Sequence, residues 1–386
     1  MPASLRIVFV PGRDIAGMAE AWDRLYAADP ESHFFLSRGF LDPIFARFET
    51  TGAFVCLEGE TPVGILPVSV ETLWDEAREC FRTEYRMAGS KHWADYSGIL
   101  IDPAAEPAVI DAYARHFRQS PWGRIRFKNL RMSDRRQDRF FAQFEKSVFG
   151  VTERKKIINA GTTNNLVCPV IRLPESFDAY TSALSKNNRK NMRKHLRRVE
   201  EGEYGIRAGT AEDLADFERL WLAQWGKGSS GKSRARRYAE TIRIGLAQGT
   251  VHLPVLSDRE GHTLGMICNF HDPVRRDIGC FVSARAAEAG SVPVALILHG
   301  HCIRRAIDEG YATYDFLRGD EPYKFDMGAE ARAIRYPVLR RRTAAPAEDL
   351  LSPLSAQAVL RDLPDLAGTA DAGRIRTACA QLARFF

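Results

Sequence analysis

The stretch Tyr314-Asp-Phe-Leu-Arg-Gly-Asp-Glu-Pro-Tyr-Lys324 is the densest group of chemically reactive side chains in the sequence. It overlaps the end of Tyr311–Leu317, an apolar run that predicts a strand. Because proteins that combine strands and helices place ligands at strand ends, we expect these side chains to emerge together in a site. A plain turn with an ion pair between Arg318 and an acid is the structural alternative, but such a turn needs neither the tyrosine nor the lysine beside it.

A helix predicted over Val292–Glu309 leads into that strand. Ahead of it, Gly290 allows the backbone to come close to a ligand, Ser291 can cap the helix, and the amides of 290–292 form a ready anion site. Arg285 precedes this loop. An ordinary capped core helix explains the same residues equally well.

Strands and helices alternate along both halves of the chain. Each half combines a largely antiparallel meander with helices and then a helix-to-strand crossover. The sequence therefore predicts an α+β (broadly α/β) fold with two copies in tandem, mixed and mostly antiparallel sheets flanked by helices, and a short helical tail. The predicted domains are 1–174 and 175–343, followed by a tail over 344–386, in which Arg374–Phe386 has the apolar spacing of one amphipathic helix. We expect Arg332–Arg340 to be the last strand.

A basic segment, Ser185–Val199, contains seven Lys/Arg and no acid, and it accounts for the whole net charge of +6. We predict that it belongs to a helix over Asp178–Glu201. Its cations recur at helical spacing, and phosphates are their natural counter-charge. A solvated surface helix is an equally weighted alternative. The candidate binding residues on this helix are Lys186, Arg189, Lys190 and Arg193.

Several classes of protein are excluded. No apolar run approaches the roughly 20 residues that cross a bilayer. The 7 cysteines are scattered singly, and His299 and His301 lie two apart on a helix, so we expect no disulfide framework and no metal. One of these histidines should belong to the core. Gly226–Ser233 matches the P-loop formula, but a predicted helix, Leu214–Trp225, precedes it where a strand is required. We expect a cytoplasmic protein with reduced thiols.

In the first half, the loop Lys91–Tyr96 lies between predicted strands. Asp95 and Tyr96 are candidate contacts for a substrate held between the two domains. A loop with an aromatic anchor is the structural alternative.

The basic helix, the helix end Trp221–Trp225 and above all the segment 314–324 resemble the CelD/BcsL-type acetyltransferase-like proteins. That family belongs to the GNAT superfamily and is similar to the Fem-type peptidyltransferases, which carry two GNAT-like domains in tandem. The resemblance is best from Phe177 to Arg340. One departure is that Arg285 is followed by Ala-Ala-Glu-Ala before Gly290, so the GNAT pyrophosphate loop is not intact. The residues that carry most of the resemblance are Asp315, Gly319, Asp320, Glu321, Tyr323 and Lys324.

The resemblance implies an acyltransferase that moves an acyl group, in the first instance acetyl from acetyl-CoA, onto an amine or hydroxyl of a small or envelope-precursor acceptor. Asp320 or Glu321 would take the nucleophile's proton, and Tyr323 would donate one to the departing thiolate. The other roles are shared among two groups of residues. Lys324, Arg318 and Asp315 would stabilise charge or hold the acceptor, and Gly290, Ser291, Val292 and Arg285 would hold the donor.

Two alternatives stay open. Aminoacyl-tRNA-dependent transfer of the Fem type would use the basic helix to bind tRNA. A non-catalytic module would use the same helix to bind an anionic partner. The sequence leaves the acceptor, the acyl group and the oligomeric state undetermined.

Overall fold

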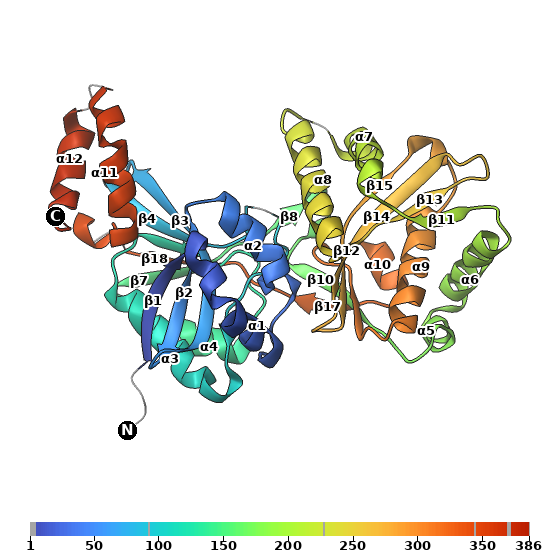
Figure 1. The fold of residues 1–386 in the computed structure, drawn as a ribbon, viewed down its shortest axis with the longest axis horizontal. Coiled ribbons are helices and arrows are strands. Elements are labelled where there is room, and N and C mark those ends of the chain that lie inside the picture. Colours follow the sequence, from blue (N-terminus) through green and yellow to red (C-terminus); the bar gives the residue numbers. More distant parts are fainter. Residues whose placement is uncertain (1–4, 92, 227, 343–344, 369–371, 386) are drawn as a thin grey trace. The chain divides into compact units, whose positions relative to one another are not determined.

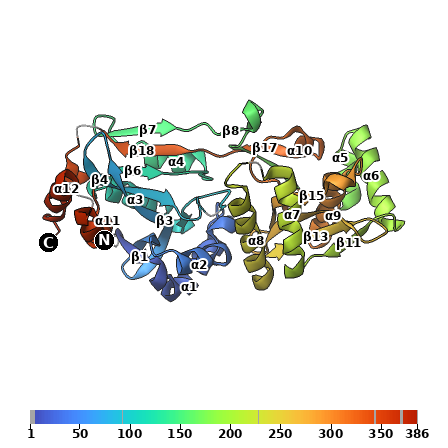
Figure 2. The same ribbon diagram turned by 90° about the horizontal axis from the view of Figure 1, so that it is seen from above.

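The computed structural model describes residues 5–91, 93–226, 228–342, 345–368 and 372–385. The chain divides into two compact units, residues 1–156 with 334–386 and residues 157–333. Each unit contains one large sheet with helices against it (Figures 1 and 2).

The first sheet has the strand order β1-β2-β3-β4-β6-β18-β7, and β5 pairs with β3 beside this path. Neighbouring strands are antiparallel except for β4 and β6, which are parallel. The strands are β1 (Leu5–Pro11), β2 (Thr51–Glu58), β3 (Thr61–Asp75), β4 (Cys80–Met87), β5 (Leu100–Ile101), β6 (Arg124–Arg126), β7 (Phe149–Glu153) and β18 (Pro337–Arg341). The α-helices on this sheet are α1 (Ala19–Ala28), α2 (Arg38–Arg47), α3 (Glu106–Gln119) and α4 (Asp134–Phe141).

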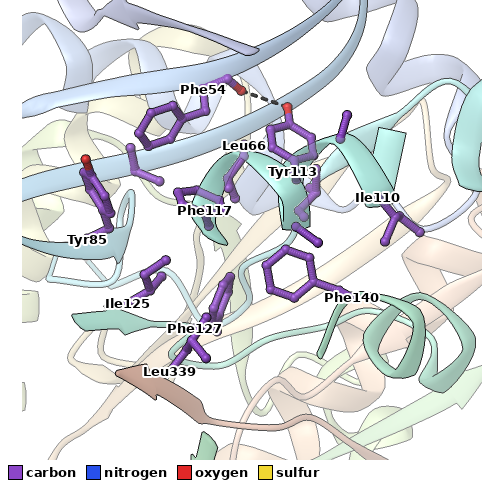
Figure 3. Close-up of a cluster of buried hydrophobic side chains, with 14 of the residues drawn as sticks. Phe54, Leu66, Tyr85, Ile110, Tyr113, Phe117, Ile125, Phe127, Phe140 and Leu339 are labelled. Atoms are coloured by element: carbon purple, nitrogen blue, oxygen red, sulfur yellow. Dashed lines mark hydrogen bonds between the residues drawn. The ribbon is translucent and has the colours of Figure 1, made fainter. Parts of the chain in front are cut away.

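An aromatic core joins α3 and α4 to the first sheet (Figure 3). Tyr113 and Phe117 on α3 are fully buried, and the Tyr113 hydroxyl donates to the Phe54 carbonyl at 2.8 Å. A Cβ at Gly64 would clash with Val109, so α3 lies directly on β3 at this point. Burial of each such side chain stabilises the unit by about 1.5–3 kcal/mol.

The second sheet repeats the first. Its order is β11-β13-β14-β15-β16-β10-β17, with β15 and β16 parallel and β12 paired with β14 beside the path. The predicted α+β class and the tandem repeat of one fold are confirmed by this correspondence. The strands are β10 (Val167–Arg172), β11 (Gly205–Ala208), β12 (Val251–His252), β13 (Pro254–Ser257), β14 (Thr263–Asp272), β15 (Asp277–Arg285), β16 (Thr313–Asp315) and β17 (Glu330–Ala333). The helices are α5 (Phe177–Ala183), α6 (Lys186–Glu200), α7 (Leu214–Trp225), α8 (Gly231–Gln248), α9 (Val294–Asp308) and α10 (Pro322–Asp326). A small hairpin, β8 (Ile157–Ile158) with β9 (Thr163–Asn164), precedes β10.

Two strands lie in unexpected sheets. β10 comes before the rest of the second sheet in sequence, yet it lies between β16 and β17. β18 follows β17 in sequence, yet it lies in the first sheet between β6 and β7. The predicted single strand Arg332–Arg340 is therefore wrong: it is two strands in two different sheets. The division of the chain also differs from the predicted boundary after residue 174, because β10 belongs to the second unit.

The C-terminal helices pack on the first unit. Besides the expected helix, which is α12 (Ala372–Leu382), the tail contains α11 (Pro353–Gly368). Leu351, Val359 and Leu382 are buried together, and Gln381 Nε2 donates to the Phe81 carbonyl of β4 at 2.9 Å. Residues 343–344, where the tail was predicted to start, lie outside the described residues.

The basic helix is broken. A single helix over Asp178–Glu201 was predicted, but the chain turns at Leu184 and restarts as α6 because Ser185 caps it, accepting from the Asn188 amide. Met192 packs on α9 where Gly300 leaves room for it. As predicted, a helix, α7, leads to the Gly/Ser-rich loop. Among the described residues, no helix is long and apolar enough to span a membrane.

Candidate functional site

A cavity of about 400 Å³ lies within the second unit. It is bounded by β14 and β15, the first turns of α9, and residues of α6 and α10. Its walls are mostly apolar with a few polar groups, which is typical of a small-molecule site. The apolar lining includes Leu184, Met192, Met266, Ile267, Val294, Leu298 and Met327, and the polar lining is Asn188, Asn191, Gln224, Ser283, Arg285, His299, Tyr323 and Asp326.

The loop that leads into α9 contributes Pro293 to the cavity lining, whereas Gly290, Ser291 and Val292 do not line the cavity. Gly290 has φ +53° and ψ −121°, a conformation that favours glycine, and the Arg285 guanidinium donates to its carbonyl. The amides of Gly290 and Val292, two of those expected to bind an anion, donate to carbonyls within the loop, and the anion site stays a prediction.

Helix α9 begins at Val294, two residues later than predicted, and no side chain caps it, so the expected Ser291 cap is absent. In the described structure, no acceptor is assigned to the amides of Ala295 and Leu296, and both residues line the cavity.

Lys324 organises the reactive segment from inside the protein. It is 5% exposed, and its Nζ lies 2.8 Å from Glu321 Oε2. Nζ also donates to the carbonyls of Phe316, Arg318 and Gly319, at 3.4, 3.1 and 2.9 Å. Lys324 and Glu321 thus form an ion pair within this turn. These contacts give Lys324 a structural role, and its predicted catalytic role stays untested.

The two aspartates of the segment also bind backbone. Asp315 accepts from the Leu317 amide at 2.7 Å and from Arg332 Nη2 at 2.6 Å. Asp320 accepts from the Asn164 amide at 2.7 Å. Neither residue lines the cavity. Of the four residues predicted to act in catalysis, only Tyr323 lines the cavity.

Tyr323 meets His299 at the cavity wall, their ring centroids 6.0 Å apart. Tyr323 is 42% exposed, yet desolvation by the surrounding protein raises the pKa of its phenol above the ordinary value of 10. His299 is 2% exposed, and burial, with a smaller effect of the Lys324 charge, lowers the pKa of its imidazole to about 3. At neutral pH both side chains are therefore uncharged. The prediction that one of the two α9 histidines is a core residue is confirmed for His299, but its place at the cavity was not foreseen.

The basic helix presents amides, not cations, to the cavity. Asn188 and Asn191 line it, and Asn188 Nδ2 donates to the Asp326 carbonyl at 2.8 Å. The predicted cations lie elsewhere. Lys186 and Lys190 are exposed, Arg189 donates to the Ser182 carbonyl, and Arg193 donates to Thr181 and Asp178. The sequence contained one sign that the two asparagines share a face with the core: they are three residues apart on a helix, and Asn191 is next to apolar Met192.

Asp95 and Tyr96 belong to the first unit and are buried there. The Tyr96 ring contacts His33 and lies under the Arg131 guanidinium, at 5.6 and 5.2 Å. These contacts agree with the structural alternative, in which Tyr96 anchors the loop. The role of Asp95 and Tyr96 in binding a substrate stays a prediction. Among the described residues, the one group with metal-ligand spacing is Asp258, Glu260 and His262 on the turn before β14, outside the cavity lining.

Residues 186–325 match a family described as an acetyltransferase (GNAT) domain. No curated protein matches the sequence. Among solved structures, FemX gives a TM-score of 0.60 at 9% identity, covering 86% of this chain and 96% of FemX. A conserved protein of unknown function from Bacteroides thetaiotaomicron VPI-5482 gives 0.52 at 12% identity, covering 87% of this chain and 100% of that one.

At these identities the structural likeness concerns the fold alone. The narrower CelD/BcsL resemblance stays a prediction. Nearly the whole cavity lining, from Asn188 to Met327, falls within or beside the matched segment. Residues 186–325 are thus similar to an acetyltransferase (GNAT) domain, within a chain that shares the fold of FemX.

Proposed function

We propose that the second unit transfers an acyl group from acyl-CoA to an amine or hydroxyl of an acceptor that enters the same cavity. The observation that carries this proposal is the composition of one cavity. A guanidinium and helix-start amides lie in its lining together with an apolar wall and two neutral proton-transferring side chains, His299 and Tyr323. The match to an acetyltransferase domain supports it.

The donor's charged and apolar parts find suitable groups. Amides at a helix start and a guanidinium favour phosphate oxygens, so the amides of Ala295 and Leu296 with Arg285 would hold the diphosphate. The pantetheine arm and acyl group would lie along Met266, Val294 and Leu298. The acyl group would in the first instance be acetyl.

In the reaction, the acceptor's nitrogen or oxygen attacks the thioester carbonyl carbon, and the carbon–sulfur bond breaks. Tyr323 would donate a proton to the thiolate, because its raised pKa keeps the phenol protonated at neutral pH. Asp320 and Glu321 remain candidates for taking the nucleophile's proton, but their contacts with Asn164 and Lys324 favour a structural role. The acceptor would be a small molecule or an envelope precursor.

Transfer from aminoacyl-tRNA is the second candidate. It is supported by Lys186 and Lys190, which are exposed and have no ion-pair partner among the described residues. Binding through such cations would weaken steeply with salt. A non-catalytic module, by contrast, would keep its activity in cells when Tyr323 is replaced by Phe.

Ligand-dependent thermal unfolding distinguishes these possibilities. A ligand at 100 times its Kd stabilises the folded chain by about 2.7 kcal/mol, so acetyl-CoA should raise the Tm. Arg285→Ala should reduce this shift, whereas Arg243→Ala, an exposed arginine outside the cavity lining, should not. A shift with tRNA and none with any acyl-CoA would refute the proposal.

A further inference from the structure

Four buried side chains form a continuous chain of hydrogen bonds behind the cavity. His299 Nδ1 lies 2.9 Å from the Tyr314 hydroxyl, which lies 3.3 Å from Asn269 Oδ1. Asn269 Nδ2 lies 3.2 Å from Cys302 Sγ. The four residues come from α9, β16 and β14, and all are buried. Such a buried network holds its members in one arrangement when each is satisfied.

The direction of these bonds follows from the Asn269 amide. Its nitrogen donates to Cys302, so its oxygen accepts the single proton of the Tyr314 hydroxyl. The Tyr314 oxygen can then only accept from His299, which must carry its proton on Nδ1. Nε2 is left with a lone pair, and among the described residues it has no hydrogen-bond partner. His299 lines the cavity, so this lone pair is the group it can offer a ligand.

We propose that His299, held in the Nδ1–H tautomer by Tyr314 and Asn269, accepts at Nε2 the proton of the acceptor's attacking amine or hydroxyl. This inference rests on the proposed acyl transfer and assigns the proton acceptor that the sequence placed at Asp320 or Glu321.

The protons balance over one turnover. As the acceptor's nitrogen or oxygen bonds to the acyl carbon, its proton moves to Nε2. The electron pair of the breaking carbon–sulfur bond goes to sulfur, and Tyr323 protonates the thiolate. The His299 imidazolium then returns its proton to the Tyr323 phenolate, and both side chains are restored.

Burial sets the resting protonation state of His299. Burial keeps the imidazole neutral, so the lone pair is available throughout the neutral range. The imidazolium is a stronger acid than a tyrosine, so the return of its proton to the Tyr323 phenolate runs downhill. The charged group facing His299 is Lys324, and its other titratable neighbours are Tyr314 and Tyr323.

Nitrogen-15 NMR of histidine-labelled protein tests the tautomer directly. A difference spectrum against His299→Gln identifies the residue. We expect a protonated Nδ1 and an unprotonated Nε2 from pH 6 to 8. In Tyr314→Phe, the preference for Nδ1–H should be lost. A protonated Nε2 in the wild-type chain would overturn the proposal.

Kinetics test the role. His299→Ala should lower kcat by about 10²–10⁴-fold, while KM for acyl-CoA changes by less than about threefold. His301→Ala is the matched control, on the same helix but outside the cavity lining, and should keep kcat. If His299→Ala does not fold, the closer-sized His299→Gln gives the same comparison. A folded variant with more than a third of wild-type kcat would refute the role of His299 alone, whereas a wild-type chain that turns over no acyl-CoA would refute the proposed function itself.

Discussion

Replacing Lys324 by Met should destabilise the second unit strongly. Methionine fills a similar volume but removes the ammonium group, which pairs with Glu321 and donates to three backbone carbonyls. Removing one partner of a buried ion pair costs about 3–5 kcal/mol. The Glu321 side chain is 31% exposed and can recover some hydration, so we expect the lower end, about 3 kcal/mol. That is a large share of the roughly 5–15 kcal/mol of a typical folded protein.

Urea unfolding of the full chain, followed by tryptophan fluorescence to which Trp221 and Trp225 of the second unit contribute, measures this loss. Glu321→Gln tests the same pair from its other side: the Lys324 ammonium keeps its carbonyl contacts but loses its counter-charge, so we expect a comparable cost of about 3 kcal/mol. Suppose instead that Lys324→Met unfolds within about 0.5 kcal/mol of wild type and yet has lost acyl transfer. The structural reasoning would then be refuted, and Lys324 would act in the chemistry as the family resemblance implies.

Three further predictions concern pH, chain boundaries and the donor loop. Burial lowers the pKa of His252 to about 3 and that of His271 to about 4, so below pH 6.5 the unfolded chain binds more protons than the folded one. Stability should therefore fall as pH drops from 7 to 4.5, by at most about 1.4 kcal/mol per pH unit for each histidine, and replacing both by Asn should flatten the urea-unfolding profile. Circular dichroism should show that a fragment 157–333 folds better than 175–343, which lacks β10; equal folding of the two would contradict the strand assignment. Gly290→Ala should strain the loop by about 1–3 kcal/mol and raise the Kd for acyl-CoA in calorimetry, and an unchanged Kd would exclude this loop from the donor site.

Most of the fold could be predicted because it follows local periodicity. The alternation of apolar residues in β14 and the helical spacing of α9 each identify their element without knowledge of its neighbours. The misassigned strand, Arg332–Arg340, failed for the opposite reason. Nothing local indicates that Ala333 and Pro337 pair with strands of different sheets, because strand pairing is a long-range property.

The site was predictable only in part for the same reason. Tyr323, predicted to act in catalysis, lines the cavity and keeps that role as a prediction. Its neighbours Asp320 and Lys324 bind backbone groups that the sequence cannot reveal. The spacing of His299 and His301 argues against a metal site and suits a core residue, so the sequence does not indicate a role for His299. Its significance comes from Tyr314 and Asn269, which approach it from other elements.

The placement of β18 has a consequence for how the chain acquires its structure during translation. In the first sheet, residues 337–341 of β18 lie between β6 and β7 and pair with both. These residues emerge from the ribosome after the entire second unit. The N-terminal half therefore cannot finish its sheet first, as domains of a growing chain usually do. Until β18 is synthesised, β6 and β7 each have an unpaired backbone edge. These edges are therefore where a chaperone would bind, or where a chain released too early would aggregate.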